Sequence, residues 1–183
     1  MSLPRLLVLT DRRQLPRGRG LAETVGACIA AGLSHVVLRE LDLADGPRAE
    51  LAARLTKLGA TLIAAHRKVP GAIGVQLPAG ATVPSLGRSC HSPAEVAAAA
   101  NAGVGYVTLG PVGTSKSKPG YGPPLDRAAL GGHPIPVYAL GGVDPDNAAE
   151  MLDAGAHGVA VMGAVMASSE PQAVVRDLLA VTG

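Results

Sequence analysis

Glycine-rich and hydroxyl-rich segments follow several short apolar runs in this chain of 183 residues, and their composition is typical of phosphate-binding loops. Gly141-Gly142 comes directly after one apolar run, and Met162-Gly163 comes directly after the next. Glycine lets backbone N–H groups approach an anion closely, especially where a loop leads into a short helix. The longest such segment spans residues 110–122 and predicts a mobile lid over the phosphate. Its candidate contacts to the phosphate are Ser115, Ser117 and Lys118.

Two histidines also follow apolar runs and are candidates for proton transfer. These are His66 and His91, and Lys118 in the lid is a third candidate for a catalytic role. An imidazole with its ordinary pKa near 6.5 exchanges protons readily at neutral pH. Cys28 and Cys90 lack the spacing of a metal site, so the sequence predicts no bound metal.

Eight short apolar runs and several helical stretches must position these residues. The runs are continuous rather than alternating, as in parallel strands that are covered on both faces. The predicted strands are residues 5–10, 35–40, 61–66, 72–77, 86–91, 106–110, 136–140 and 158–162. The predicted helices are 21–31, 47–58, 93–102, 144–155 and 171–181.

This alternation predicts a compact (β/α)8 TIM barrel that forms a single domain over residues 1–183, with an open doubly wound sheet as the alternative. The third and fourth predicted strands are joined only by residues 67–71, and the fourth and fifth only by residues 78–85. Neither segment has room for a normal helix, so we expect the helices after strands 3 and 4 to be shortened or missing. In such a barrel the active site lies where the strands end.

The amino-acid composition argues against nucleic acids and membranes as binding partners. The chain has a net charge of +2, no Trp or Phe and three Tyr, which disfavours electrostatic or stacking contacts with nucleic acid. No apolar stretch approaches the roughly 20 residues of a membrane span, so we expect no contact with a membrane. Two unpaired cysteines and no leader sequence favour a cytoplasmic protein.

Eight short motifs occur in order along residues 5–180 and are identified with a known family. They are LTDR (9–12), VVLRE (36–40), GVQL (74–77), SCHS (89–92), GYVTLGPV (105–112), SKPG (117–120), YALGGV (138–143) and AGAHGVAVMGAV (154–165). This set resembles the thiamine phosphate synthase/TenI superfamily. The resemblance implies a phosphorylated heterocycle as ligand and, as substrate-binding residues, Arg39, Ser89, Ser115, Ser117, Gly141, Gly142, Met162 and Gly163.

The chain departs from the synthase pattern where that pattern binds Mg²⁺. Synthases of this family join a pyrimidine diphosphate to a thiazole phosphate, with Mg²⁺ on the diphosphate held by two aspartates. At those two positions this chain has His66 and Ala81, and it also lacks the family's Gln and Lys, at Val37 and Leu41. Mg²⁺ requires oxygen ligands. The resemblance therefore points to the TenI branch, whose thiazole tautomerases need no metal.

We accordingly predict a TenI-like protein of thiamine biosynthesis that binds a thiazole phosphate and acts as a metal-independent tautomerase. The tautomerase histidine of the family is Pro111 here, so the proton carrier would be His66 or His91. Two alternatives stay open. One is a divergent thiamine phosphate synthase, for which Mg²⁺ would be a cofactor, and the other is a non-catalytic regulator that binds thiazole phosphate. We also expect a homodimer, because a barrel stripped of two helices exposes apolar surface.

Overall fold

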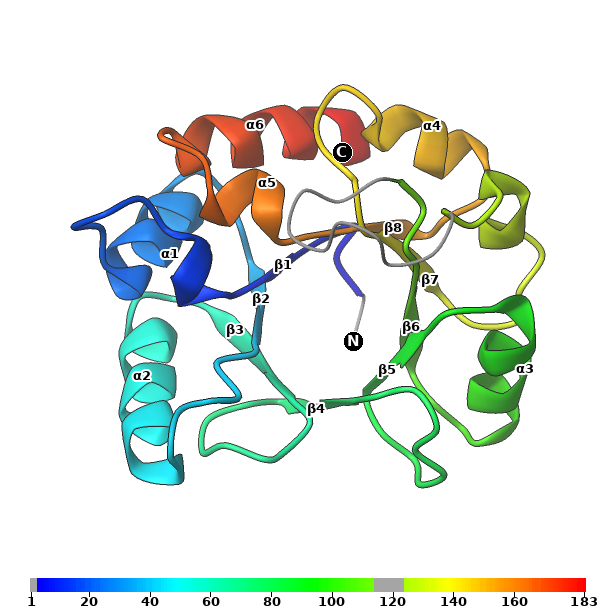
Figure 1. Ribbon diagram of the computed structural model, residues 1–183, viewed down its shortest axis with the longest axis horizontal. Coiled ribbons are helices and arrows are strands. Elements are labelled where there is room, and N and C mark those ends of the chain that lie inside the picture. Colours follow the sequence, from blue (N-terminus) through cyan, green and yellow to red (C-terminus); the bar gives the residue numbers. More distant parts are fainter. Residues whose placement is uncertain (1–2, 114–123) are drawn as a thin grey trace.

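A closed barrel of eight parallel strands forms the centre of the molecule (Figure 1). The computed structural model describes residues 3–113 and 124–183. The strands pair in sequence order, and β1 closes the barrel against β8, which confirms the predicted TIM barrel and excludes the open sheet. Their bounds are β1 Leu6–Leu9, β2 His35–Leu38, β3 Thr61–Ala65, β4 Gly74–Leu77, β5 Gly87–Cys90, β6 Tyr106–Leu109, β7 Val137–Leu140 and β8 Gly158–Val161.

The helices surround only part of the barrel. They are α1 Leu21–Ala30, α2 Asp45–Lys57, α3 Pro93–Asn101, α4 Ala148–Asp153, α5 Gly163–Met166 and α6 Pro171–Thr182, with 3-10 turns at Arg12–Gln14 and Arg127–Leu130. Ser92 caps α3 by accepting a hydrogen bond from the Glu95 amide, and Pro93 occupies the first helical position, as the sequence predicts. No helix in the described ranges is long and apolar enough to cross a bilayer.

The connections on both sides of β4 contain no helix, as predicted, and Figure 1 shows loops there in place of an outer layer. Between β6 and β7, the described residues form only the 3-10 turn Arg127–Leu130. Helix α4 starts at Ala148, whereas the sequence predicted a start at Asp144. The Asp144 carboxylate accepts hydrogen bonds from the amides of Asp146 and Asn147, and this local turn replaces the first helical turn.

Two apolar cores lie on the two sides of the strands. The outer core packs the barrel against the helices, and the inner core fills the barrel itself. Tyr106 and Tyr138 lie in the inner core and pack edge to face, with their ring centroids 5.3 Å apart. Gly87 is required beside them, because a Cβ atom there would lie 2.3 Å from Cζ of Tyr106. Most strands are buried on both faces and are apolar in sequence, whereas β4 is only partly buried and β5 contains Arg88 and Ser89.

Candidate functional site

Arg39, at the end of β2, faces residues from β1 and β8. Its Nη1 lies 2.7 Å from Sδ of Met162 and 4.0 Å from a carboxylate oxygen of Asp11. Its backbone amide donates to Oγ1 of Thr10, which fixes the end of β2 against β1. The structure thus brings together Arg39 and Met162, two of the predicted substrate-binding residues.

The carboxylates beside Arg39 are engaged in ion pairs. Asp11 accepts hydrogen bonds from Arg13 and Gln14 at 3.0 Å each. Burial alone would raise the pKa of Asp11, but these hydrogen bonds outweigh it and lower that pKa. Glu40 is buried and accepts from the backbone and the guanidinium of Arg12. Both carboxylates therefore already have cationic partners.

His66, at the end of β3, adopts a left-handed backbone conformation with φ of 63°. Its amide donates to the carbonyl of Gln76 at 2.8 Å, which ties it to β4, while its side chain lies in an exposed position. Partial burial of the imidazole, followed by the positive charges of Arg39 and Arg48, lowers the pKa of His66 from the ordinary value of 6.5. The ring is thus neutral at physiological pH and can accept a proton.

His91 follows β5, on the other side of β4 from His66. Its Nδ1 lies 2.8 Å from the carbonyl oxygen of Gly110, and its amide donates to the Glu95 carboxylate at 2.6 Å. A ring nitrogen that bonds to a carbonyl must carry the hydrogen, so in the neutral ring Nε2 is the acceptor. His66 and His91 thus follow β3 and β5, the two strands that flank β4.

Arg48 is a residue of this region that the sequence analysis missed. It lies on α2 and is 1% exposed. Its guanidinium donates to the carbonyls of Leu38 at 3.0 Å, Ala65 at 2.9 Å and Arg67 at 3.1 Å. These carbonyls precede Arg39 and flank His66, so Arg48 holds both rim residues in place. The spacing of Arg48, Ala52 and Leu55 on one face of α2 was a signal in the sequence, since the other two are core residues.

Glycines lie in the loops that follow β7 and β8. Gly141 and Gly142 have φ of 91° and 74°, a region that side chains rarely adopt. Asn147 holds this loop by donating from Nδ2 to the carbonyl of Gly142 at 2.8 Å. Gly163 opens α5 after β8, and a Cβ atom there would meet only Oε1 of Gln14, at 3.2 Å. The described residues therefore leave space beside Gly163, whereas a Cβ atom at Gly141 would lie 2.9 Å from Cβ of Pro111.

Three of the predicted site residues, Ser115, Ser117 and Lys118, lie outside the described residues. Ser89 is described, and its Oγ accepts a hydrogen bond from Nε2 of Gln76 at 3.2 Å. Ser89 is half-buried and lies next to the last residue of β5.

The residues present do not fit the Mg²⁺ that the family resemblance implies. His66 and Ala81 occupy the positions of the two aspartates, and neither side chain offers an oxygen. Among the residues that the structure describes, no three His, Cys, Asp or Glu side chains group in a way that could hold a metal ion. A hard cation needs several oxygen ligands, so we assign no metal-binding role to this rim.

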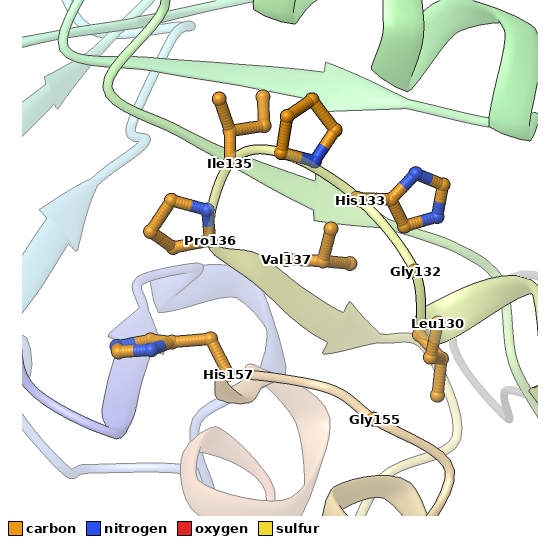
Figure 2. A pocket seen from close by; sticks show the side chains of 9 residues that line it. Leu130, Gly132, His133, Ile135, Pro136, Val137, Gly155 and His157 are labelled. Carbon is orange, nitrogen blue, oxygen red and sulfur yellow. The ribbon is translucent and has the colours of Figure 1, made fainter.

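A cavity of about 320 Å³ opens at the opposite end of the barrel, among the residues that lead into β7 and β8 (Figure 2). Its polar side chains are His133 and His157. His133 bonds through Nε2 to the carbonyl of Ala129 at 2.8 Å, and His157 packs edge-to-face on Tyr138. These contacts are those of structural histidines, and the cavity lies away from the strand ends that carry the candidate site.

An NMR titration tests the electrostatics of the rim. We expect the pKa of His66 to lie below 6.5, and Arg39→Gln to raise it, because that substitution removes a neighbouring positive charge. His35 is the internal control, since burial alone lowers its pKa, and this pKa should be the same in the wild type and in Arg39→Gln.

The lowered pKa of His66 also determines how the stability of the fold depends on pH. His66 contributes stability above about pH 6.5 and loses it as the pH falls through the folded-state pKa. An unchanged His66 pKa in the variant would contradict this description of the rim.

The chain is similar over nearly its whole length to several known proteins. A family model described as thiamine monophosphate synthase matches residues 81–165. A provisionally named thiamine-phosphate synthase of Geobacter sulfurreducens is 37% identical, over 96% of this chain and 92% of its own length. The thiamine-phosphate synthase of Mycobacterium tuberculosis is 32% identical, over 97% and 94%. The solved thiamine phosphate pyrophosphorylase of Pyrococcus furiosus superposes with a TM-score of 0.81 at 25% identity, over 97% of this chain and 95% of that one.

Proposed function

Because the chain belongs to the thiamine monophosphate synthase/TenI family, we propose that it binds a thiazole phosphate where its strands end and acts as a thiamine-phosphate synthase. The observation that carries this proposal is 32–37% identity to proteins named as synthases, over nearly the whole chain. This proposal differs from the tautomerase predicted from the sequence, because the similarity to synthases extends over the entire barrel.

The described residues divide the proposed work between two parts of the rim. The loops at Gly141-Gly142 and Gly163 hold the phosphate of the thiazole through backbone amides. Arg39 supplies a positive charge beside them, with a side chain that is 28% exposed. Joining a pyrimidine diphosphate to the thiazole releases diphosphate, and Arg39 would stabilise its negative charge. No step is assigned to a metal ion, since the oxygen ligands for Mg²⁺ are replaced.

A metal-independent thiazole tautomerase is the second candidate, and His66 is the observation that favours it. The exposed imidazole replaces a carboxylate on the rim, and its lowered pKa keeps it in the basic form at neutral pH. A neutral imidazole can take a proton from a bound heterocycle and return it elsewhere. In this candidate function, His91 or Lys118 would be the partner acid.

Ligand binding and turnover distinguish these candidates. We expect thiazole phosphate to raise the melting temperature, while inorganic phosphate at the same concentration has a smaller effect. A ligand at 100 times its Kd adds about 2.7 kcal/mol, which is roughly 5–11 °C for a domain of this size. Formation of thiamine phosphate from pyrimidine diphosphate and thiazole phosphate, with and without Mg²⁺, would establish the synthase.

Other outcomes would redirect the assignment. Conversion of carboxythiazole phosphate without formation of thiamine phosphate would establish the tautomerase and reject the synthase. Binding of thiazole phosphate with neither turnover would reject both and support a regulator. Absence of binding by every thiazole ligand would contradict the proposed function as a whole.

The proposal includes a cytoplasmic homodimer. Cys28 and Cys90 are both free thiols and both buried, as suits a reducing compartment. Ile73 and Val83, which flank β4 where no helix covers the barrel, are 44% and 57% exposed. Sedimentation of the purified protein would give the mass of two chains if this face is shared, and of one chain if it is not.

A further inference from the structure

A buried hydrogen-bond network crosses the inside of the barrel beneath the rim. The Tyr106 hydroxyl donates to Oε1 of Gln76 at 2.8 Å. Nε2 of Gln76 donates to Oγ of Ser89 and to Oγ1 of Thr108, at 3.2 Å each. Tyr106 and Thr108 are at most 1% exposed and Gln76 is 4% exposed, so this network lies in the protein interior. Gly87 leaves the space that lets the phenol reach β4.

The surroundings of Tyr106 determine which way the Gln76 amide faces. Within the described residues, the Tyr106 hydroxyl has no hydrogen-bond partner other than Gln76, and its neighbours in the inner core are apolar. If the amide were reversed, the phenol would accept from Nε2 and its own hydrogen would be buried without an acceptor. A buried donor without an acceptor is strongly disfavoured, because it has lost its hydrogen bond to water without gaining another. Burial also raises the pKa of Tyr106, so the phenol stays protonated and remains a donor.

The orientation of the amide then determines the role of Ser89. Both hydrogens of Nε2 are directed to hydroxyl oxygens, so the hydroxyls of Ser89 and Thr108 each act as acceptors toward Gln76. The hydrogen of each hydroxyl must therefore point elsewhere. Thr108 is buried, whereas Ser89 is only half-buried and lies at the end of β5. The Ser89 hydrogen is thus available to a molecule bound at the barrel mouth.

We infer that Gln76 is a positioning residue that fixes Ser89 as a hydrogen-bond donor toward the ligand. This inference rests on the proposed function for the location of the ligand, but the orientation of the network does not depend on it. It specifies the chemistry of the ligand atom that meets Ser89. That atom is an acceptor, such as a phosphate oxygen or an unprotonated ring nitrogen, and not an N–H group.

Gln76→Glu is the direct test, because a carboxylate accepts hydrogen bonds from all three neighbours. The Ser89 hydroxyl would then donate to the introduced carboxylate and present only its lone pairs to the ligand. We expect the Kd for thiazole phosphate or pyrimidine diphosphate, whichever the wild type binds, to rise about tenfold to a hundredfold at pH 8. The loss should diminish as the pH falls and the introduced carboxyl becomes protonated. A purely structural role for Gln76 would not produce this pH dependence.

Two further variants control for loss of fold and for the route of the effect. Tyr106→Phe preserves the volume of the core and removes only the anchor of the amide, so we expect a several-fold rise in Kd. Ser89→Ala should weaken binding in the wild type but cause no further loss in the Gln76→Glu background, since the two changes remove the same hydrogen bond. Additive losses, or unchanged affinity in folded Tyr106→Phe and Gln76→Glu, would overturn the inference.

An NMR measurement on the unliganded protein separates this inference from the proposed function. We expect nuclear Overhauser contacts from the Nε2 hydrogens of Gln76 to the Thr108 methyl group. Strong contacts to the Tyr106 ring instead would mean that the amide is reversed, and would overturn the inference whether or not a ligand binds. If the wild type binds no thiazole or pyrimidine ligand, the proposed function fails, while these contacts still decide the orientation of Gln76.

Discussion

Arg48→Met is expected to lower the free energy of unfolding by about 3 kcal/mol. The guanidinium is the partner of three carbonyls, those of Leu38, Ala65 and Arg67. A buried carbonyl that loses its partner costs roughly 1–3 kcal/mol, and relief of the desolvated charge offsets part of the sum. Methionine fills much of the same volume, so a cavity contributes little to the effect. For a domain of this size the expected fall in melting temperature is roughly 6–12 °C.

Arg54→Met is the matched control for this prediction. Arg54 lies on the same helix but is exposed, so the same substitution should change stability by less than about 0.5 kcal/mol. Denaturant unfolding of both variants makes the comparison. A second readout follows His66, whose pKa should rise in Arg48→Met because a nearby positive charge is removed. Equal stability of the two variants would show that Arg48 does not hold the ends of β2 and β3.

Gly163→Asp should nearly abolish binding of thiazole phosphate. The new carboxylate would lie in the loop that we propose binds the phosphate, and two like charges about 5 Å apart repel by about 3 kcal/mol at an effective dielectric constant near 20. That energy corresponds to at least about a hundredfold weaker binding. Among the described residues, the added Cβ atom would meet only Oε1 of Gln14, the far end of a side chain that can shift, so we expect the fold to be retained.

Gly163→Asn separates charge from size. Asparagine has the shape of aspartate without its charge, so it should weaken binding far less. Titration calorimetry with thiazole phosphate at two salt concentrations gives both affinities, and the difference between the variants should shrink at high salt. Similar affinities for the two variants would place the phosphate away from α5. The melting temperatures without ligand verify that both variants are folded.

The barrel could be predicted from the amino-acid sequence alone. Continuous apolar strands, such as residues 61–65 and 106–109, occur where both faces of a strand are buried, and a parallel barrel covered by helices provides that environment at most of its strands. Local chemistry also located α3, because its start depends only on Ser92, Pro93 and Glu95, which are close in sequence. The short connections around β4 predicted the missing helices, since chain length alone excludes them.

The residues at the rim could also be predicted from the sequence, because all parallel strands end at the same face of the barrel. Arg39, Ser89, Gly141, Gly142, Met162 and Gly163 lie where their strands predicted them. The partner of each side chain could not be predicted in the same way. Arg13 and Gln14 donate hydrogen bonds to the Asp11 carboxylate, and Met162 meets Arg39 across 123 positions of chain.

The pairing of the buried polar groups could not be predicted from the sequence and is seen in the folded protein. In sequence, Arg48 is an ordinary charge on a helix and Gln76 is one polar residue in a strand. Their roles depend on carbonyls and hydroxyls from other strands, which closure of the barrel brings within 3.2 Å. Apolar burial is non-directional and repeats along the chain, so a local pattern records it. Hydrogen bonds are directional and join residues far apart in sequence, so their partners are known only once the strands are in register.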